Sequence, residues 1–101
     1  MAKDLTVGAL LDVYGAFLSD KQNEIMSHYF NDDLSLSEIA ENENITRQAV
    51  GDIIKRGEIT LKRYERECGY HGKISEIQKI CKSDIADSEK IARITGIVED
   101  F

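Results

Sequence analysis

Proline is absent from this sequence of 101 residues, and the alternation of apolar and polar residues that marks strands is scarce. Proline is the residue that most strongly interrupts a helix, and strands have little support without alternation. We therefore predict an all-α fold. The length fits a single domain over residues 1–101, which can bury one core without help from metals or disulfides.

Long apolar runs are also missing, so no segment is expected to span a membrane. Asp4 and Asp12 interrupt the apolar residues near the start, where a secretory leader would have an unbroken run. The two cysteines, Cys68 and Cys81, suit free thiols in a reducing compartment. We expect a cytoplasmic protein with no membrane insertion.

The sequence has no arrangement of residues typical of an active site. No Ser-His-Asp or Cys-His set has an orienting third group, no glycine-rich phosphate loop is present, and no calcium-loop pattern follows Asp32 and Asp33. Cys68, His71 and Cys81 offer three zinc ligands, but a structural zinc site needs four in paired spacing. We expect no enzymatic activity, no metal and no cofactor.

The net charge of −6 argues against a protein that binds nucleic acids over its whole surface. Its distribution is uneven, because residues 1–45 carry −7, residues 46–66 carry +3 and residues 67–101 carry −2. The acidic residues of the first segment are interpreted as solvated surface and helix caps. The one net basic segment coincides with a single predicted helix.

Helical spacing of apolar residues and cap signals place the predicted helices. Ser19 with Gln22, and Ser35 with Glu38, have capping-box spacing, and Gly69 suits a helix C-terminus. The helices are expected at roughly 4–18, 20–30, 36–42, 46–67 and 72–101. The last segment is either two short helices or one bent helix.

The segment SLSEIAENENITRQAVGDIIKR, residues 35–56, meets the packing demands of a helix-turn-helix. Ala40 is small enough for a close helix crossing, Asn44 tolerates a positive φ in the turn, and Ile45 can anchor the turn. The motif is predicted within a core of roughly residues 20–66, followed by a helical tail at 72–101. The predicted core residues are Leu11, Tyr14, Leu18, Ile25, Tyr29, Leu36, Ile39, Ala40, Ile45, Val50 and Ile54.

The stretch DKQNEIMSHYFNDDLSLSEIAENENITRQAVGDIIKR resembles sigma-factor region four, and resembles more closely the YlxM-like family of small bacterial helix-turn-helix proteins. The similarity covers residues 5–70 through FLSDKQ, YFNDDLSLSEIAE, TRQAV and IKR. It implies a helix-turn-helix without a wing, with an N-terminal helix and a C-terminal helical tail. It also implies a regulatory protein, linked by inference to the signal recognition particle pathway.

The exposed face of the second motif helix is the predicted nucleic-acid site. Arg47 and Gln48 have the chemistry to read base edges, and Lys55 and Arg56 to contact phosphates. The predicted contact residues are Thr46, Arg47, Gln48, Gly51, Asp52, Lys55 and Arg56. The alternative is a solvated helix face in which Asp52 and Glu58 serve as salt-bridge partners.

The isoleucine-rich tail has two compatible interpretations. It can cover the helix-turn-helix as part of the core, and it can also form the seam of a homodimer through Ile91, Ile94, Val98 and Phe101. Two functions remain open from the sequence. The chain is a regulator that binds double-stranded DNA, or it is an accessory factor that binds RNA or protein of the signal recognition particle and has no duplex-DNA target.

Overall fold

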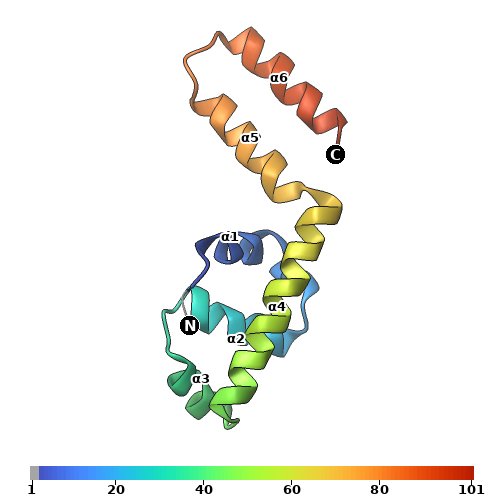
Figure 1. The fold of residues 1–101 in the computed structure, drawn as a ribbon. Helices are drawn as coiled ribbons and strands as arrows, with labels where there is room; N and C mark the ends of the chain where they lie inside the picture. Colours follow the sequence, from blue (N-terminus) through green and yellow to red (C-terminus); the bar gives the residue numbers. More distant parts are fainter. Residues whose placement is uncertain (1–2) are drawn as a thin grey trace.

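The computed structural model describes residues 3–101, and every regular element in that range is helical, as predicted (Figure 1). The elements are α1 (Leu5–Tyr14), the 3-10 turn η1 (Gly15–Phe17), α2 (Asp20–Phe30), α3 (Leu36–Glu43), α4 (Arg47–Cys68), α5 (Tyr70–Lys82) and α6 (Asp87–Glu99). The molecule is elongated, measuring 54 × 24 × 20 Å. None of the helices within residues 3–101 is long and apolar enough to cross a bilayer.

Side-chain caps set the starts of the helices in the motif. The Ser35 hydroxyl accepts a hydrogen bond from the Glu38 backbone N–H, and the Glu38 carboxylate accepts one from the Ser35 N–H, which completes the predicted capping box. At Ser19 the serine half is formed, with the Gln22 N–H as donor. Thr46 caps α4 in the same way. These bonds satisfy amide groups that have no partner inside the helix.

The first helix is shorter than predicted, because α1 ends at Tyr14 and a 3-10 turn replaces the expected continuation to Leu18. Gly15 packs tightly at this point. A Cβ there would lie 3.0 Å from the Asn23 side-chain oxygen and 3.2 Å from Leu11. The backbone therefore changes from α-helix to a 3-10 turn at Gly15. Leu18 is extended and leads directly into Ser19, the N-cap of α2.

Two buried clusters share helix α2 and form the core. One lies between α1, α2 and the C-terminal half of α4, and contains Val7, Leu10, Leu11, Tyr14, Leu18, Met26 and Leu61. The other lies between α2, α3 and the N-terminal half of α4, and contains Ile25, Tyr29, Ile39, Ala40, Val50 and Ile54. No residue of α5 or α6 belongs to either cluster.

Nine of the eleven predicted core residues are buried, and two are not. Leu36 is half-buried against the second cluster. Ile45 was predicted to anchor the turn but is exposed, with 37% of its surface accessible. It stands between left-handed Asn44 and the extended Thr46 cap, and this sharp change of direction leaves its side chain at the surface.

Helix α4 is a 22-residue rod that packs against α1, α2 and α3 (Figure 1). Gly57 is buried at its centre, where Met26 of α2 approaches the α4 backbone. A Cβ on Gly57 would lie only 2.0 Å from the Met26 sulfur. The α2–α4 crossing therefore depends on the absence of a side chain at this position.

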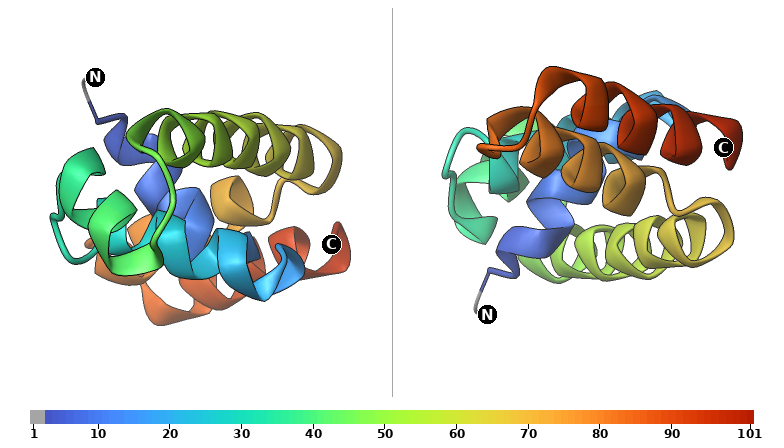
Figure 2. Two further views of the ribbon diagram at one scale, coloured as in Figure 1. Left: turned by 90° about the horizontal axis from the view of Figure 1, so that it is seen from below. Right: turned by 90° about the horizontal axis from the view of Figure 1, so that it is seen from above.

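The tail consists of two helices, which resolves the alternative left open by the sequence. Gly69, at φ 68°, is both the end of α4 and the cap of α5, so no linker separates them. The expectation that the tail covers the helix-turn-helix is wrong. Only the first turns of α5 approach α1 and α4, and α6 lies alongside α5 (Figure 2). The hairpin therefore projects beyond the rest of the chain (Figure 1).

A hydrogen-bonded joint holds this hairpin to the remainder of the chain. The Tyr14 hydroxyl donates to Glu65 at 2.6 Å and accepts from the Tyr70 N–H at 3.0 Å. Glu65 also accepts from the N–H groups of His71 and Gly72, both at 3.0 Å, so its charge lies at the positive N-terminus of α5. We call Tyr14, Glu65 and residues 70–72 the joint.

Aromatic packing extends from the joint to the last residue. The Tyr70 ring stacks on Tyr14 at 6.2 Å and on Phe101 at 5.7 Å. The Lys73 ammonium donates to the Asp100 carbonyl at 2.6 Å and lies over the Phe101 ring. These contacts join the start of α5 to the end of the chain. Phe101 was predicted to lie at a dimer seam, and here it contacts residues of its own chain.

Candidate nucleic-acid interface

The turn between α3 and α4 has the geometry of a helix-turn-helix. Asn44 adopts the left-handed conformation predicted for it, with φ 55° and ψ 43°. The Ile45 N–H then donates to the Ala40 carbonyl at 3.1 Å and closes the end of α3. Ile39 and Ala40 pack with Val50 and Ile54 in one buried cluster, so the opposite face of α4 is turned outward.

The predicted contact residues lie on that outward face. Thr46, Arg47, Gln48, Asp52, Lys55 and Arg56 are all exposed. Gly51 is half-buried, and a Cβ there would meet nothing within 4 Å, so the surface around it is open. Within residues 3–101, no ion pair engages Arg47, Lys55 or Arg56. Their charged groups are therefore available to an external ligand.

The cationic face continues past the predicted site to the end of α4. Lys62, Arg63 and Arg66 are exposed at spacings that extend the face carrying Lys55 and Arg56. Lys62 pairs with Asp4 at 3.4 Å, and Arg63 lies over the Tyr64 ring, while Arg66 has no ion pair in the described range. Sequence reasoning ended the site at Arg56, although the +3 charge of residues 46–66 already signalled this extension.

Arg47 lines a shallow hollow of about 320 Å³ between the start of α4 and the loop before α3. Lys3 closes one side by pairing with Asp33 and lying 4.8 Å from the centre of the Tyr29 ring. The Lys3 ammonium lowers the pKa of Asp33, and the Ser35 backbone N–H lowers the pKa of Glu38. Both carboxylates stay ionised, so the hollow combines Arg47 with a negative rim.

An ionic cluster on the far side of the motif ties α2 to the end of α3. Glu24, His28 and Glu43 bring their ligand atoms within 4.8 Å of one another, an arrangement that sequence reasoning did not find. The Lys21 ammonium already supplies a cation there, 2.6 Å from Glu43 and 3.4 Å from Glu24. Hydrogen bonding with Glu43 raises the pKa of Lys21, and the same bond lowers the pKa of Glu43. The cluster therefore holds the end of α3 to α2.

Comparison with known proteins agrees with this geometry. Residues 1–100 match the family described as "Putative helix-turn-helix protein, YlxM / p13 like". A UPF0122 protein of Acetivibrio thermocellus is 40% identical over 100 residues, covering 99% of this chain and 86% of the relative. One of Desulforamulus reducens is 45% identical over 73 residues, covering 72% of this chain and 62% of the relative. The aligned stretch thus spans less than two thirds of the Desulforamulus protein. The chain belongs to the UPF0122 family of YlxM / p13-like helix-turn-helix proteins.

Proposed function

We propose that this chain is a non-catalytic regulatory protein of the cytoplasm that binds double-stranded DNA through α3 and α4. The observation that carries the proposal is the outward face of α4, where Arg47, Gln48, Lys55 and Arg56 are exposed above a buried motif core. A helix presented in this way fits the major groove. The acidic remainder of the chain opposes nonspecific binding, so affinity for a duplex of arbitrary sequence is expected to be weak.

Base reading is assigned to the first turn of α4. Arg47→Ala and Gln48→Ala are each expected to relax sequence preference by about 1–3 kcal/mol, because Arg pairs with guanine edges and Gln with adenine edges. The measurement is selection from random duplexes with the wild type, followed by titration of the enriched site and its single-base variants. If selection returns no enriched sequence, the duplex-DNA function is wrong.

Phosphate contact is assigned to the next turns. Lys55→Ala and Arg56→Ala are each expected to weaken binding to all duplexes alike and to reduce the salt slope by about 0.9, the contribution of one phosphate contact. Lys79→Ala is the matched control, because Lys79 is an exposed lysine of the hairpin. An unchanged slope in both α4 variants would contradict the assignment.

A second candidate is an accessory factor of the signal recognition particle that binds its RNA or protein. The observation that favours its protein-binding form is the −7 charge of residues 1–45, which would repel any nucleic acid approaching from that side, RNA as well as a DNA duplex. The purified chain should then capture particle RNA or protein while failing to enrich any duplex. In that outcome the basic face of α4 becomes the docking surface for the particle.

A further inference from the structure

The α5–α6 hairpin is the part of the chain that lacks a core. Each helix has 13 residues, and neither contains a buried residue. Of the nine large apolar side chains that are exposed within residues 3–101, five lie here: Tyr70, Ile74, Ile91, Val98 and Phe101. Helices of this length are marginal in water without tertiary packing. The exposed apolar side chains of the hairpin therefore need a packing partner, and the rest of the described chain leaves them exposed.

Each helix carries an apolar stripe that is wider than one neighbour can cover. Helices α5 and α6 pack on each other, and Ile77, Ile80, Ile94 and Ile97 are the isoleucines of these two helices that are half-buried. A stripe with heptad spacing shares Ile77 and Ile94 with this set and extends away from Ile80 and Ile97. It consists of Tyr70, Ile74, Ile77 and Cys81 on α5 and of Ile91, Ile94, Val98 and Phe101 on α6. A helix in a four-helix bundle contacts two neighbours and shows this wide stripe.

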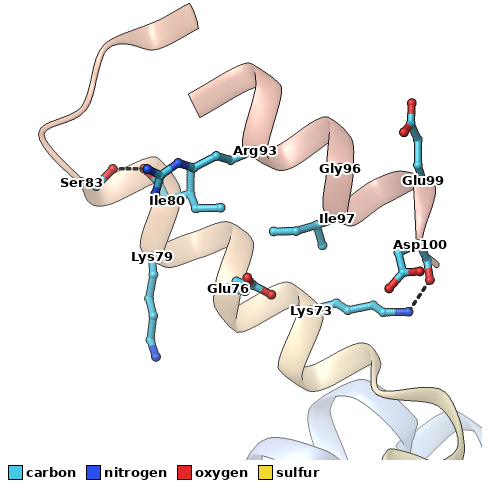
Figure 3. A pocket seen from close by; sticks show the side chains of 10 residues that line it. All are labelled: Lys73, Glu76, Lys79, Ile80, Ser83, Arg93, Gly96, Ile97, Glu99 and Asp100. Carbon is cyan, nitrogen blue, oxygen red and sulfur yellow. Dashed lines mark hydrogen bonds between the residues drawn. The ribbon is translucent and has the colours of Figure 1, made fainter. Parts of the chain in front are cut away.

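The open groove between the helices is a different surface. It measures about 920 Å³, and charged side chains of both signs, including Lys73, Glu76 and Arg93, surround its apolar residues Ile80 and Ile97 (Figure 3). Neither Ile91 nor Val98 lines it. The uncovered apolar residues thus gather on another side of the hairpin, and we call Ile74, Ile91, Ile94 and Val98, with Tyr70 and Phe101 at one end, the apolar face.

We propose that the apolar face packs against the same face of a second copy of this chain, so that two hairpins form an antiparallel four-helix bundle. The two core clusters of the chain contain no hairpin residue, so they are complete without the hairpin. The hairpin would not stabilise them by folding back onto them. A two-fold interface uses the same patch twice, which suits a face that is apolar throughout.

The exposed area is sufficient for such an interface. With an aromatic side chain taken as about 200 Å², the exposed fractions of the apolar face amount to roughly 500 Å² in each copy. Two copies would bury about 1,000 Å², which is the lower limit for a specific interface. The largest apolar patch on a monomer is typically about 300–600 Å² and is often functional, and the apolar face falls in this range.

The charges of the hairpin also complement one another. Helix α5 carries three lysines against Glu76, whereas α6 with Asp100 carries four acidic residues against Lys90 and Arg93. Within residues 3–101 neither Lys79 nor Lys82 forms an ion pair. A two-fold axis that places α6 of one copy beside α5 of the other therefore pairs opposite net charges.

The test is sedimentation velocity on the full chain without nucleic acid, so its outcome is independent of the proposed function. The wild type is expected to sediment as a dimer at tens of micromolar and to dissociate on dilution. Ile91→Asp combined with Val98→Asp should raise the dissociation constant by at least about 100-fold, because four aspartates, two from each copy, would be buried without partners. Both positions are more than half exposed in one copy, so the isolated fold should tolerate the change, and retained helical circular dichroism checks this.

Gly96→Asp is the matched control, because it places an aspartate on the groove side of the same hairpin, where a Cβ meets nothing within 4 Å, and leaves the lysines of α5 in place. It should leave the dimer intact. A wild type that remains monomeric at about 100 μM, above the tens of micromolar at which the dimer is expected, overturns the proposal. So does a dimer that the double variant and the control weaken equally. The dilution series of the wild type decides the matter even if a variant misfolds.

Discussion

Gly57→Ala is expected to lower the melting temperature of the chain by about 5–10 °C, although alanine is the better helix former. The added Cβ would lie 2.0 Å from the sulfur and 2.8 Å from the terminal carbon of Met26, which is completely buried, so the Met26 side chain would have to shift within the core. Overpacking of this kind costs about 1–3 kcal/mol. For a domain of this size 1 kcal/mol corresponds to about 4–8 °C.

Gly51→Ala is the matched control, because it makes the same substitution in the same helix where a Cβ meets nothing within 4 Å. It should stabilise the chain by about 0.5–1 kcal/mol through reduced backbone entropy in the unfolded state. Thermal unfolding of both variants gives the comparison. Equal shifts of the same sign would show that Met26 moves aside freely, and a double-mutant cycle with Met26→Ala measures the coupling directly.

Glu65→Ala is expected to destabilise the chain by about 2–3 kcal/mol and to loosen the hairpin. It removes a partly buried carboxylate that accepts hydrogen bonds from the Tyr14 hydroxyl and from two amide groups of α5. Amide hydrogen exchange should accelerate at His71 and Gly72 more than in α2 or α3. Tyr14→Phe is the control, because it removes one hydroxyl and leaves the hydrogen bonds that the His71 and Gly72 N–H groups donate to Glu65.

The contribution of Glu65 should also depend on pH. Burial raises its pKa, but the hydrogen bonds from Tyr14, His71 and Gly72 outweigh this and hold the pKa below its usual value of 4.5. A carboxyl group with a lowered folded-state pKa stabilises fully above the unfolded-state value and loses that contribution as the pH falls through the folded-state value. The stability difference between the wild type and Glu65→Gln should therefore be constant near neutral pH and narrow below about pH 4.5. A difference that widens in acid would contradict the joint as described.

Local signals explain what the sequence predicts well. The capping box of Ser35 and Glu38, the left-handed Asn44 and the terminating Gly69 each depend on neighbours within a few residues, and all three are confirmed. Apolar spacing likewise places Val50 and Ile54 in the core, because the period of a helix decides which side of α4 faces inward. The outward contact residues follow from the same period, although their role as a binding site stays a prediction.

Features that depend on distant partners were not predicted. Glu65 accepts a hydrogen bond from Tyr14, which lies 51 residues away in the sequence. Position 57 needs a glycine because Met26, on another helix, approaches the backbone there. The prediction that the tail covers the helix-turn-helix was wrong for a related reason. An apolar stripe shows that a face needs cover, but it does not show which surface supplies the cover. The end of the first helix was misplaced because the close contact of Gly15 with Asn23 cannot be seen in the spacing of α1 alone.

Because α4 is a single unbroken helix, a tilt at one of its ends would displace the other end. Its 22 residues make a rod of about 33 Å, with the contact residues at one end and the joint at the other. A tilt of about 10° at the contact end would swing the joint end by about 6 Å at this length. Tyr14 and Glu65 tie α5 to that end, so the hairpin would move with the rod. In a dimer joined at the hairpins, we expect the distance between two bound DNA sites to set the tilt of both α4 helices. Binding at one site would then depend on the position of the other.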